Sequence, residues 1–457
     1  PDGLPAEFWK HFEHTVAPDL LRVLLECEHE GALCVTLRSG VITVLYKKGD
    51  PKEIRNYRPI TLLNSEYKIF AKILVSKMKR ALEHFVSTEQ LGFVPGRLIN
   101  EASHLVKLIQ AYLDENDEDG LLIAIDWEKA YDRASWEYKE QAYEALGFGG
   151  RFRRLVGLLS NSYAPPIRAV RASGTMSALF HIHSGVPQGC PFSPLDFLVV
   201  LEALSRVIKS CKKIKGITIG EMTHLLSQFA DDTLLFLRGY ASLRAFWDKI
   251  DDFERASGMK ANRPKTIGLR AGPLRRKPPP LIPELRTHLI QWVGEGKWTK
   301  LLGIPFWEQA ETDDFWESLY QSVKRLIARW TGHITNSPFG RANLANAMVY
   351  SRIRYVLSVM VPPRWFTLSI DEDVQALVWA KDYLFDKNEI GSMLDYSRWM
   401  KSESQTLKTK DGFGLGLIDW PAHEKALRSR WVLRYLDATQ GPWKTVLDEW
   451  VCRDDCH

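Results

Sequence analysis

The chain has 457 residues, of which 45% are hydrophobic and 26% charged, a balance typical of globular domains and not of disordered segments. Its 61 lysines and arginines exceed its 56 acidic residues by five, which favours a nucleic-acid partner only weakly. No apolar run reaches the roughly 18 residues of a membrane span, and no signal peptide is visible, so we expect no membrane partner. Six scattered cysteines suggest no disulfide framework, and we therefore expect an intracellular, reducing compartment.

The first predicted elements are a helical segment over residues 4–28 and the strand-like stretch GVITVLYKKGD at 40–50. A long amphipathic helix is predicted over 64–86. The side chains expected on its apolar face are Tyr67, Phe70, Ile73, Leu74, Met78 and Leu82. Because the chain starts without methionine, we expect it to be a piece of a longer polypeptide.

Further along, the acidic loop DENDEDG leads into the short apolar strand LLIAID, which ends at Asp126. The stretch LLSQFADDTLLFLR reads as two apolar strands around Asp231 and Asp232, and a helix is predicted over 242–256. The basic, proline-rich stretch at 272–285 predicts an extended connector. Twelve of the sixteen tryptophans follow residue 290, in a region with mostly helical spacing, and we expect most of them in packing roles.

Three carboxylates mark strand ends or turns. Two interpretations of Asp231 and Asp232 are open from this stretch alone, because aspartate forms turns well and adjacent carboxylates also suit hard divalent cations. Asp126 ends another apolar strand, and two such positions on one sheet can meet at the same edge. Converging carboxylates repel one another unless cations neutralise them. Two Mg²⁺ ions in such a site would serve phosphoryl transfer.

Five blocks occur in order along the chain, and they are AIDWEKAYDRAS, SGVPQGCPFSPLDFLVVLEAL, FADDTLLF, SGMKANRPKT and KWTKLLGIPF. The blocks and their order resemble those of the reverse transcriptases of LINE-type non-LTR retrotransposons. Upstream, YKKGDPKEIRNYRPITLL and EQLGFVPGR are similar to the finger region of that family, and downstream stretches are similar to its thumb. Any one block is weak evidence, whereas five in order are specific.

The resemblance implies an α+β, right-hand polymerase fold, with an antiparallel palm sheet flanked by helices and a mostly helical C-terminal region. The expected parts are an N-terminal extension at 1–40, fingers at 41–120, a palm at 121–310, a helical thumb at 311–395 and a connecting region at 396–457. Within the palm range we expect a returning finger segment at about 148–184 and a primer grip at about 298–306.

The resemblance also implies roles for single residues. Asp126 and Asp231 match the acids that hold both metal ions, Asp232 matches their neighbour, and Lys265 matches a lysine that protonates the pyrophosphate leaving group. Tyr131 matches the steric gate against the ribose 2′-OH. The expected dNTP contacts are Arg58, Tyr131, Gln188 and Gly189. The expected primer-grip residues are Leu302 and Gly303, and the weaker template or phosphate candidates are Lys47, Lys48, Lys68 and Arg97.

The implied activity is RNA-directed DNA synthesis with two Mg²⁺ ions, for which Mn²⁺ can substitute. The implied partners are an RNA template, dNTPs and a DNA primer or nicked target DNA. An endonuclease domain is expected elsewhere in the polypeptide, and the nucleus or a cytoplasmic ribonucleoprotein is the expected location. A viral-type RNA-dependent RNA polymerase is the second hypothesis, against which Ala230 and Tyr131 argue. A decayed copy that only binds RNA and a domesticated host gene are further hypotheses.

At the C-terminus, Cys452, Cys456 and His457 have a spacing that could begin a zinc knuckle. Three such residues do not make a site, and we weigh zinc there as a minor hypothesis.

Overall fold

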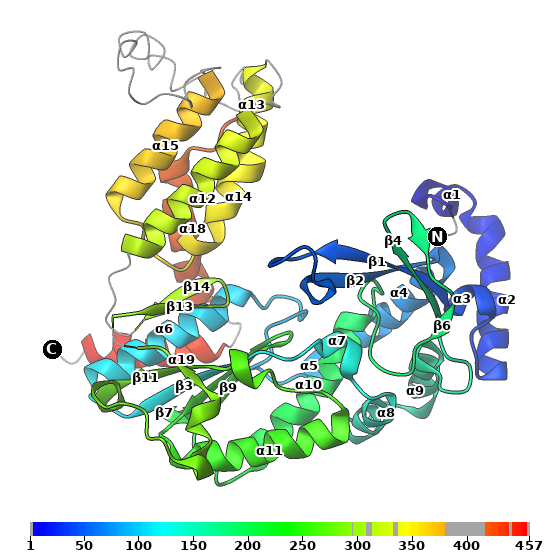
Figure 1. Ribbon diagram of the computed structural model, residues 1–457, viewed down its shortest axis with the longest axis horizontal. Helices are drawn as coiled ribbons and strands as arrows, with labels where there is room; N and C mark the ends of the chain where they lie inside the picture. The colour runs from blue at the N-terminus through cyan, green and yellow to red at the C-terminus, as the bar shows by residue number, and fades with distance from the viewer. Residues whose placement is uncertain are drawn as a thin grey trace. The chain divides into compact units, whose positions relative to one another are not determined.

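The computed structural model describes residues 3–294, 296–307, 313–331, 337–379, 416–437 and 441–454. The described chain mixes helices with small sheets, which confirms the α+β class (Figure 1). It divides into two compact units. The first contains residues 1–99 and 112–292, and the second contains residues 100–111 and 293–457.

The central sheet of the first unit positions the three carboxylates predicted from the sequence. Its strands follow the order β12 (Gln291–Trp292), β11 (Ile267–Ala271), β3 (Gly120–Ile125), β10 (Asp232–Leu237) and β9 (Leu226–Phe229). β3 is antiparallel to both β10 and β11, and β9 and β10 form an antiparallel hairpin, as the sequence predicts. β12 adds a short parallel edge to β11.

Two helices, α10 (Ser193–Ser210) and α11 (Ala241–Ser257), cover one face of this sheet (Figure 1). Side chains such as Phe197 and Trp247 pack with β3 and β10 in one buried cluster. The sequence predicts α11 over 242–256, within one residue of its observed ends. Most residues of α10 are buried, including Asp196. The Asp196 carboxylate pairs with the Lys139 ammonium at 2.9 Å and accepts a hydrogen bond from the Tyr143 hydroxyl at 2.9 Å.

A second sheet in the same unit joins segments far apart in sequence. Its path is β2 (Tyr57–Leu63), β1 (Ser39–Tyr46), β4 (Ile167–Ala172) and β5 (Thr175–Met176), and β6 (Phe180–His181) pairs with β4. β1 and β2 are antiparallel, whereas β1 and β4 run parallel, with Ser39 opposite Ile167. Residues of the predicted returning segment therefore share a sheet with β1 and β2. The assignment of this sheet to fingers stays a prediction.

The remaining elements of the first unit are mostly short helices. They are α1 (Ala6–His11), α2 (Glu13–Glu30), α3 (Val35–Arg38), α4 (Ser65–Lys79), α5 (Leu82–Phe85), α7 (Ala130–Arg133), α8 (Trp136–Ala145), α9 (Gly150–Gly157) and the hairpin β7 (Ile217–Ile219) and β8 (Met222–His224). The amphipathic helix predicted over 64–86 is broken between α4 and α5. The prediction of its apolar face is wrong for Ile73, which is 42% exposed, whereas the other five side chains are buried. The proline-rich connector contains only short 3₁₀ turns.

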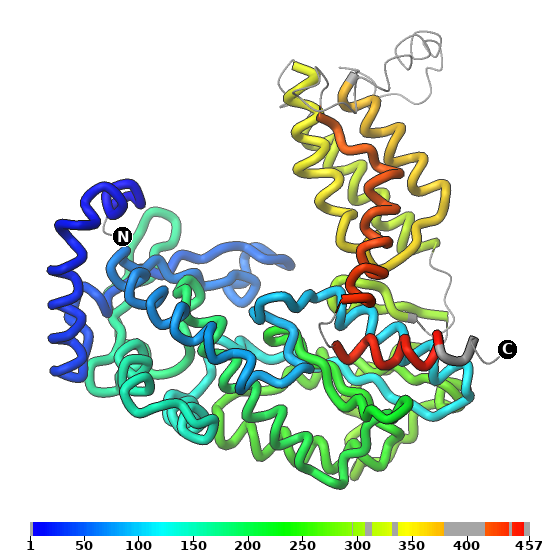
Figure 2. The backbone as a smooth tube through the Cα atoms, turned by 180° about the vertical axis from the view of Figure 1, so that it is seen from behind, coloured from blue at the N-terminus to red at the C-terminus, as the bar shows by residue number. Residues whose placement is uncertain are grey.

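The second unit is mainly helical, as the sequence predicts (Figure 2). Residues 100–111 of this unit come from helix α6 (Ile99–Glu115). Among its other residues, Trp316, Trp420 and Trp443 are buried. Its other elements are the hairpin β13 (Trp298–Leu301) and β14 (Ile304–Trp307), the helices α12 (Asp313–Thr331), α13 (Pro338–Leu344), α14 (Ser351–Leu357), α15 (Arg364–Trp379), α18 (Trp420–Leu436) and α19 (Pro442–Asp454), and a π-helical turn (Ala345–Tyr350).

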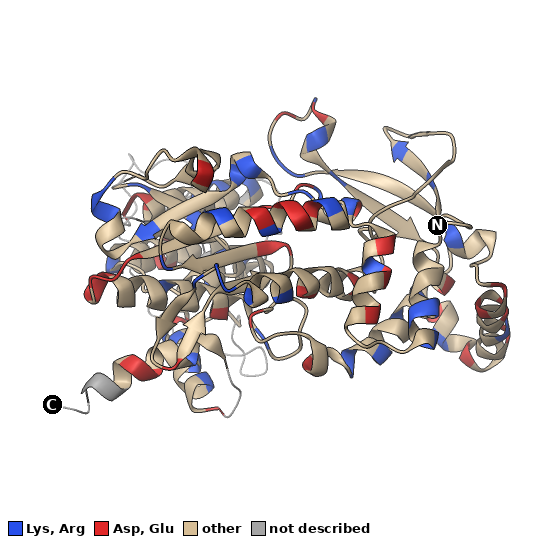
Figure 3. Cartoon of the chain, turned by 90° about the horizontal axis from the view of Figure 1, so that it is seen from below, with Lys and Arg blue, Asp and Glu red and all other residues tan. Residues whose placement is uncertain are grey.

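Basic and acidic residues are interspersed along the described helices and loops (Figure 3), in keeping with the small net charge. Among the described helices, none combines the length and the apolar character that crossing a bilayer demands.

Candidate active site

Two neighbouring strands bring Asp126 beside the pair Asp231 and Asp232. Thr233 on β10 lies opposite Ile125, the last residue of β3. Because the strands are antiparallel, the next residues along each, Asp232 and Asp126, face each other at the same end of the sheet. The strand end and the hairpin predicted from the sequence therefore meet.

A tight turn presents Asp231. Asp232 pairs with Phe229 across the β9–β10 hairpin, which leaves Ala230 and Asp231 as the two turn residues. Ala230 has a φ of 53°, in the left-handed region that favours turns of this kind but is unusual for alanine. Asp231 and Asp232 are both exposed at this turn. The turn that aspartate favours is therefore present, and cation binding at it stays a prediction.

The three carboxylates interact electrostatically. Desolvation, followed by the charges of Asp231 and Asp126, raises the pKa of Asp232 to about 6, and Lys47 opposes this shift. Clustered negative charge of this kind favours a bound cation. Over the described parts of the chain, no three His, Cys, Asp or Glu side chains form one preformed metal-binding group.

The segment after α11 contacts Asp126 directly. The Asn262 side-chain amide donates to Asp126 Oδ2 at 2.9 Å, and the Lys265 ammonium lies 3.4 Å from the same oxygen. The backbone N–H of Asn262 also donates to the Asp126 carbonyl at 2.7 Å. The sequence predicts a role for Lys265 but misses Asn262. Its position in the block SGMKANRPKT, three residues before Lys265, is the signal that could have identified it.

Tyr131 is fixed beside Asp231. Its ring stacks on Phe197 of α10, with 4.8 Å between the centroids and 19° between the planes. Burial and the charge of Asp231 both raise the pKa of the Tyr131 hydroxyl, so the phenol is neutral. The Val186 N–H donates to the Tyr131 carbonyl at 2.6 Å. A rigid aromatic ring therefore stands near the acidic turn.

The loop Gly185–Gly189 is packed against protein backbone on two sides. The Thr61 N–H of β2 donates to the Gln188 carbonyl at 2.6 Å. Gly189 has a φ of 128°, and a Cβ there would lie 2.2 Å from the Thr61 carbonyl oxygen. A Cβ on Gly185 would lie 2.5 Å from the Tyr131 carbonyl oxygen. In the structure both glycines make room for the chain itself, and contact of Gly189 with a dNTP stays a prediction.

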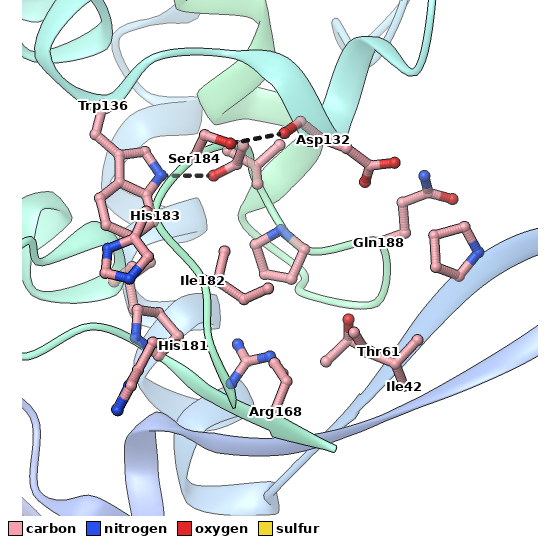
Figure 4. Close-up of a pocket in the computed structure, with 16 residues that line it drawn as sticks. Ile42, Thr61, Asp132, Trp136, Arg168, His181, Ile182, His183, Ser184 and Gln188 are labelled. Atoms are coloured by element: carbon pink, nitrogen blue, oxygen red, sulfur yellow. Dashed lines mark hydrogen bonds between the residues drawn. The ribbon is translucent and has the colours of Figure 1, made fainter. Parts of the chain in front are cut away.

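A pocket of about 280 Å³ opens beside this loop (Figure 4). Gln188 and Asp132 point toward each other at one edge of it. Burial raises the pKa of Asp132, and the charge of Lys129 and a side-chain hydrogen bond with Gln188 oppose this shift. The other side holds Arg168, His181 and His183. The predicted contact residue Gln188 therefore lines a cavity within the first unit.

The remaining predicted basic residues differ in environment. Arg58 and Lys48 are exposed on or near the β1–β2 hairpin, and Lys68 is half-buried on α4. Lys47 is close enough to Asp232 to act on its pKa. Arg97 donates to the carbonyls of Ser87 and Gln90, each at 2.6 Å, so part of its guanidinium supports the local loop. Template or phosphate contact by these side chains stays a prediction.

In the second unit, Leu302 and Gly303 form the turn between β13 and β14. Both have positive φ, of 51° and 79°, because Leu301 pairs directly with Ile304. The Tyr355 hydroxyl donates to the Leu302 carbonyl at 2.6 Å and anchors the turn to α14. The tight hairpin expected at 298–306 is present, and its role toward a primer stays a prediction. Of the suggested zinc ligands, Cys456, His457 and the Cys452 side chain lie outside the described residues.

Comparison with known sequences supplies the context of this site. A profile of the reverse transcriptase (RNA-dependent DNA polymerase) family matches residues 46–304, more than half of the chain. The Transposon TX1 uncharacterized 149 kDa protein of Xenopus laevis is 30% identical over 450 residues, covering 97% of this chain and 32% of that protein. The Retrovirus-related Pol polyprotein from type-1 retrotransposable element R2 of Popillia japonica is 29% identical over 231 residues, covering 50% of this chain and 31% of that protein.

The chain thus spans about a third of the length of these curated relatives. Among solved structures, apo telomerase from Candida Tropicalis is similar with a TM-score of 0.44 and 11% identity, over 80% of this chain and 64% of that chain. The family profile covers the three aspartates, Tyr131, Gln188 and Lys265. The chain therefore belongs to the reverse transcriptase family and is related to the polymerases of non-LTR retrotransposons.

Proposed function

We propose that this chain is the polymerase region of a non-LTR retrotransposon protein and extends a DNA primer 3′-OH on an RNA template. The observation that carries the proposal is the meeting of Asp126, Asp231 and Asp232 at one end of the central sheet. This arrangement lies within the residues that match the reverse transcriptase profile. Carboxylates on rigid strand ends are the groups that nucleotidyl transfer requires.

The three aspartates fit a site for divalent ions, because their mutual repulsion disfavours the charged state of Asp232 and a cation would relieve it. Asp126 and Asp231 would hold two Mg²⁺ ions, with Asp232 as a third ligand and with Mn²⁺ as a substitute. Bound ions of this kind supply Lewis-acid stabilisation of the attacking and leaving oxygens. Asn262 and Lys265 both contact Oδ2 of Asp126, and these two contacts orient the carboxylate.

The other residues act on the incoming nucleotide. Tyr131, stacked on Phe197, would meet a ribose 2′-OH and so favours deoxynucleotides. Gln188 lines the neighbouring pocket and offers its amide to the nascent base pair, while Gly189 keeps the loop against β2. Arg58 carries an exposed guanidinium suited to the triphosphate. Lys265, 66% exposed, can give a proton to the departing pyrophosphate.

The reaction in the cell is proposed to be target-primed reverse transcription, in which a nick in genomic DNA provides the primer. DNA is also expected to serve as a template. The first unit then corresponds to fingers and palm, and the helices of the second unit to the thumb and connecting region. Nicking would depend on an endonuclease elsewhere in the polypeptide, and the last step would take place in the nucleus.

The decisive experiment is primer extension on an RNA template with dNTPs and Mg²⁺. Wild type is compared with Asp231→Ala and with Asp252→Ala, which changes a half-exposed aspartate on α11. Extension by wild type and Asp252→Ala but not by Asp231→Ala supports the proposal. Folded wild-type protein that binds RNA without extending the primer contradicts it. Efficient synthesis in an rNTP-only lane contradicts the role of Tyr131.

A further inference from the structure

A glutamine outside the predicted site contacts the catalytic turn. Gln90 lies in the loop that follows α5 and is only 2% exposed. Its side-chain Oε1 accepts hydrogen bonds from the Gly92 N–H at 2.9 Å and from the Ala230 N–H at 3.2 Å. Ala230 is the residue immediately before Asp231, although it is 140 positions from Gln90 in the sequence.

The backbone on both sides of Gln90 is attached to β9. The Leu91 N–H donates to the Gln228 carbonyl at 2.7 Å, and the Gln228 N–H donates to the Glu89 carbonyl at 2.8 Å. Gln90 and Gln228 form a parallel bridge. The loop therefore extends the sheet at the hairpin, and the side chain of Gln90 reaches the turn from a fixed position.

The two N–H groups beside the Gln90 side chain require a hydrogen-bond acceptor at this position. Both neighbours of the Gln90 oxygen are N–H donors, so only an acceptor can satisfy them. Its Nε2 has no hydrogen-bond partner within the described chain, which indicates that the oxygen makes the useful contacts. Gly92 permits the approach, because a Cβ there would lie 2.3 Å from the Ala230 nitrogen.

The turn needs such support. Ala230 has a positive φ that alanine adopts at a cost, and Asp231 beside it belongs to a group of repelling carboxylates. Ala230 is only 6% exposed, so without the Gln90 oxygen its N–H would be buried with no hydrogen-bond acceptor. The Gln90 oxygen offsets these costs in one conformation of the turn.

We propose that Gln90 is a positioning residue of the polymerase site, which fixes the backbone of Ala230 and thereby the place of Asp231. The inference rests on the proposed function and deepens it. We assign Gln90 no contact with substrate or metal. It acts through the main chain of the turn.

Gln228 provides a matched control. It is 1% exposed, and its Oε1 accepts from the Ser205 hydroxyl at 2.6 Å. Its Nε2 is also without a partner among the described residues, and its side chain makes no hydrogen bond to the turn that the structure records. Gln90→Met and Gln228→Met remove the same amide from adjacent buried positions with nearly the same volume.

The measurement is kcat and KM for dNTP, with the half-saturating Mg²⁺ concentration, for wild type and both variants. Gln90→Met is expected to lower kcat about 10- to 100-fold, since a small misplacement of a catalytic group has an effect of that size. It should also raise the half-saturating Mg²⁺ concentration and leave primer–template affinity unchanged. Gln228→Met should keep kcat close to wild type. Equal kcat in the two variants overturns the inference.

Two further readouts separate this result from folding and from the proposed function. Gln90→Glu keeps an oxygen against both N–H groups, so hydrogen exchange at Ala230 as fast in a folded Gln90→Glu protein as in Gln90→Met overturns the inference. Hydrogen exchange of residues 229–232 does not depend on activity. Faster exchange in Gln90→Met than in Gln228→Met supports the inference, and equal exchange overturns it. An inactive wild type would contradict the proposed function alone.

Discussion

Asp126 and Asp232 face each other across the β3–β10 pair, one position beyond the pair formed by Ile125 and Thr233. Asp231 follows in the adjoining turn, so three carboxylates from two strands meet at one end of the sheet. Without a cation, their repulsion opposes the folded arrangement. The same charges that a polymerase needs therefore reduce the stability of the ion-free protein.

This conflict predicts a stabilising effect of Mg²⁺. Transfer from EDTA to Mg²⁺ is expected to raise the melting temperature, because an ion at a hundred times its Kd stabilises the folded state by about 2.7 kcal/mol. Asp231→Asn should abolish the rise. Asp232→Asn should raise the melting temperature in EDTA, since it removes one of three like charges. Asp252→Asn should leave the Mg²⁺ response intact, and a loss there would point to nonspecific binding.

The stacking of Tyr131 on Phe197 predicts how sugar selection depends on the ring. Tyr131→Ala removes the group that would clash with a 2′-OH and should reduce the preference for dNTP over rNTP by about 100-fold. Tyr131→Phe keeps the ring and should keep the preference. Single-nucleotide incorporation kinetics measure both variants. An unchanged preference in Tyr131→Ala would assign sugar selection to another residue.

The close approach of Gly189 to β2 predicts a large effect of one methyl group. Gly189→Ala combines a strained φ, which costs about 1–2 kcal/mol, with overpacking against Thr61, which adds about 1–3 kcal/mol. Gly174→Ala is the matched control, because Gly174 also has positive φ, of 82°, but a Cβ there meets nothing within 4 Å. Urea unfolding should show the larger loss for Gly189→Ala, and primer extension should fall with it. Equal losses would mean that β2 shifts freely.

The second unit contains a histidine whose protonation opposes folding. Burial lowers the pKa of His104 to about 4. Its ring meets the indole of Trp431 edge to face, and its Nε2 lies 3.3 Å from the Ser358 carbonyl oxygen. The unfolded chain binds this proton at an ordinary pKa of about 6.5, so stability is lost as pH falls from about 6.5 toward 4.

Between pH 7 and pH 5 the loss is expected to be of order 1–2 kcal/mol. His104→Asn should flatten this part of the melting-temperature profile. His224 of the first unit, whose burial also lowers its pKa to about 4, should contribute separately. A profile in His104→Asn as steep as in wild type would show that folding leaves the pKa of His104 close to its ordinary value.

The sequence predicts the local parts of the site well. The apolar run before Asp126 and the two runs around Asp231 have strand periodicity, and the aspartates stand where such strands must end or turn. α11 is predicted for a similar reason, since its apolar spacing is long and regular. No local pattern indicates which strands pair with each other. The expectation of one antiparallel sheet came from the order of the motif blocks and not from periodicity.

Contacts between distant segments are the part that sequence reasoning missed. Nothing around Gln90 indicates that its amide faces Ala230, because the contact depends on the whole sheet being formed. The close approach of Gly185 and Gly189 to the carbonyl groups of Tyr131 and Thr61 is likewise not indicated by any local pattern. Ile73 fits the apolar period of its helix, yet its neighbours leave it open to solvent.

The course of α6 limits how this protein can be divided. Residues 100–111 lie early in the chain but belong to the second unit, where Glu101 pairs with Arg434 and His104 contacts Trp431. A fragment that starts at Val293 would lack these partners, and its Arg434 and Trp431 would lose the groups that they contact. Recombination or expression boundaries at residue 292 therefore do not separate two autonomous modules. The C-terminal helices can be exchanged between relatives only together with the helix that precedes β3.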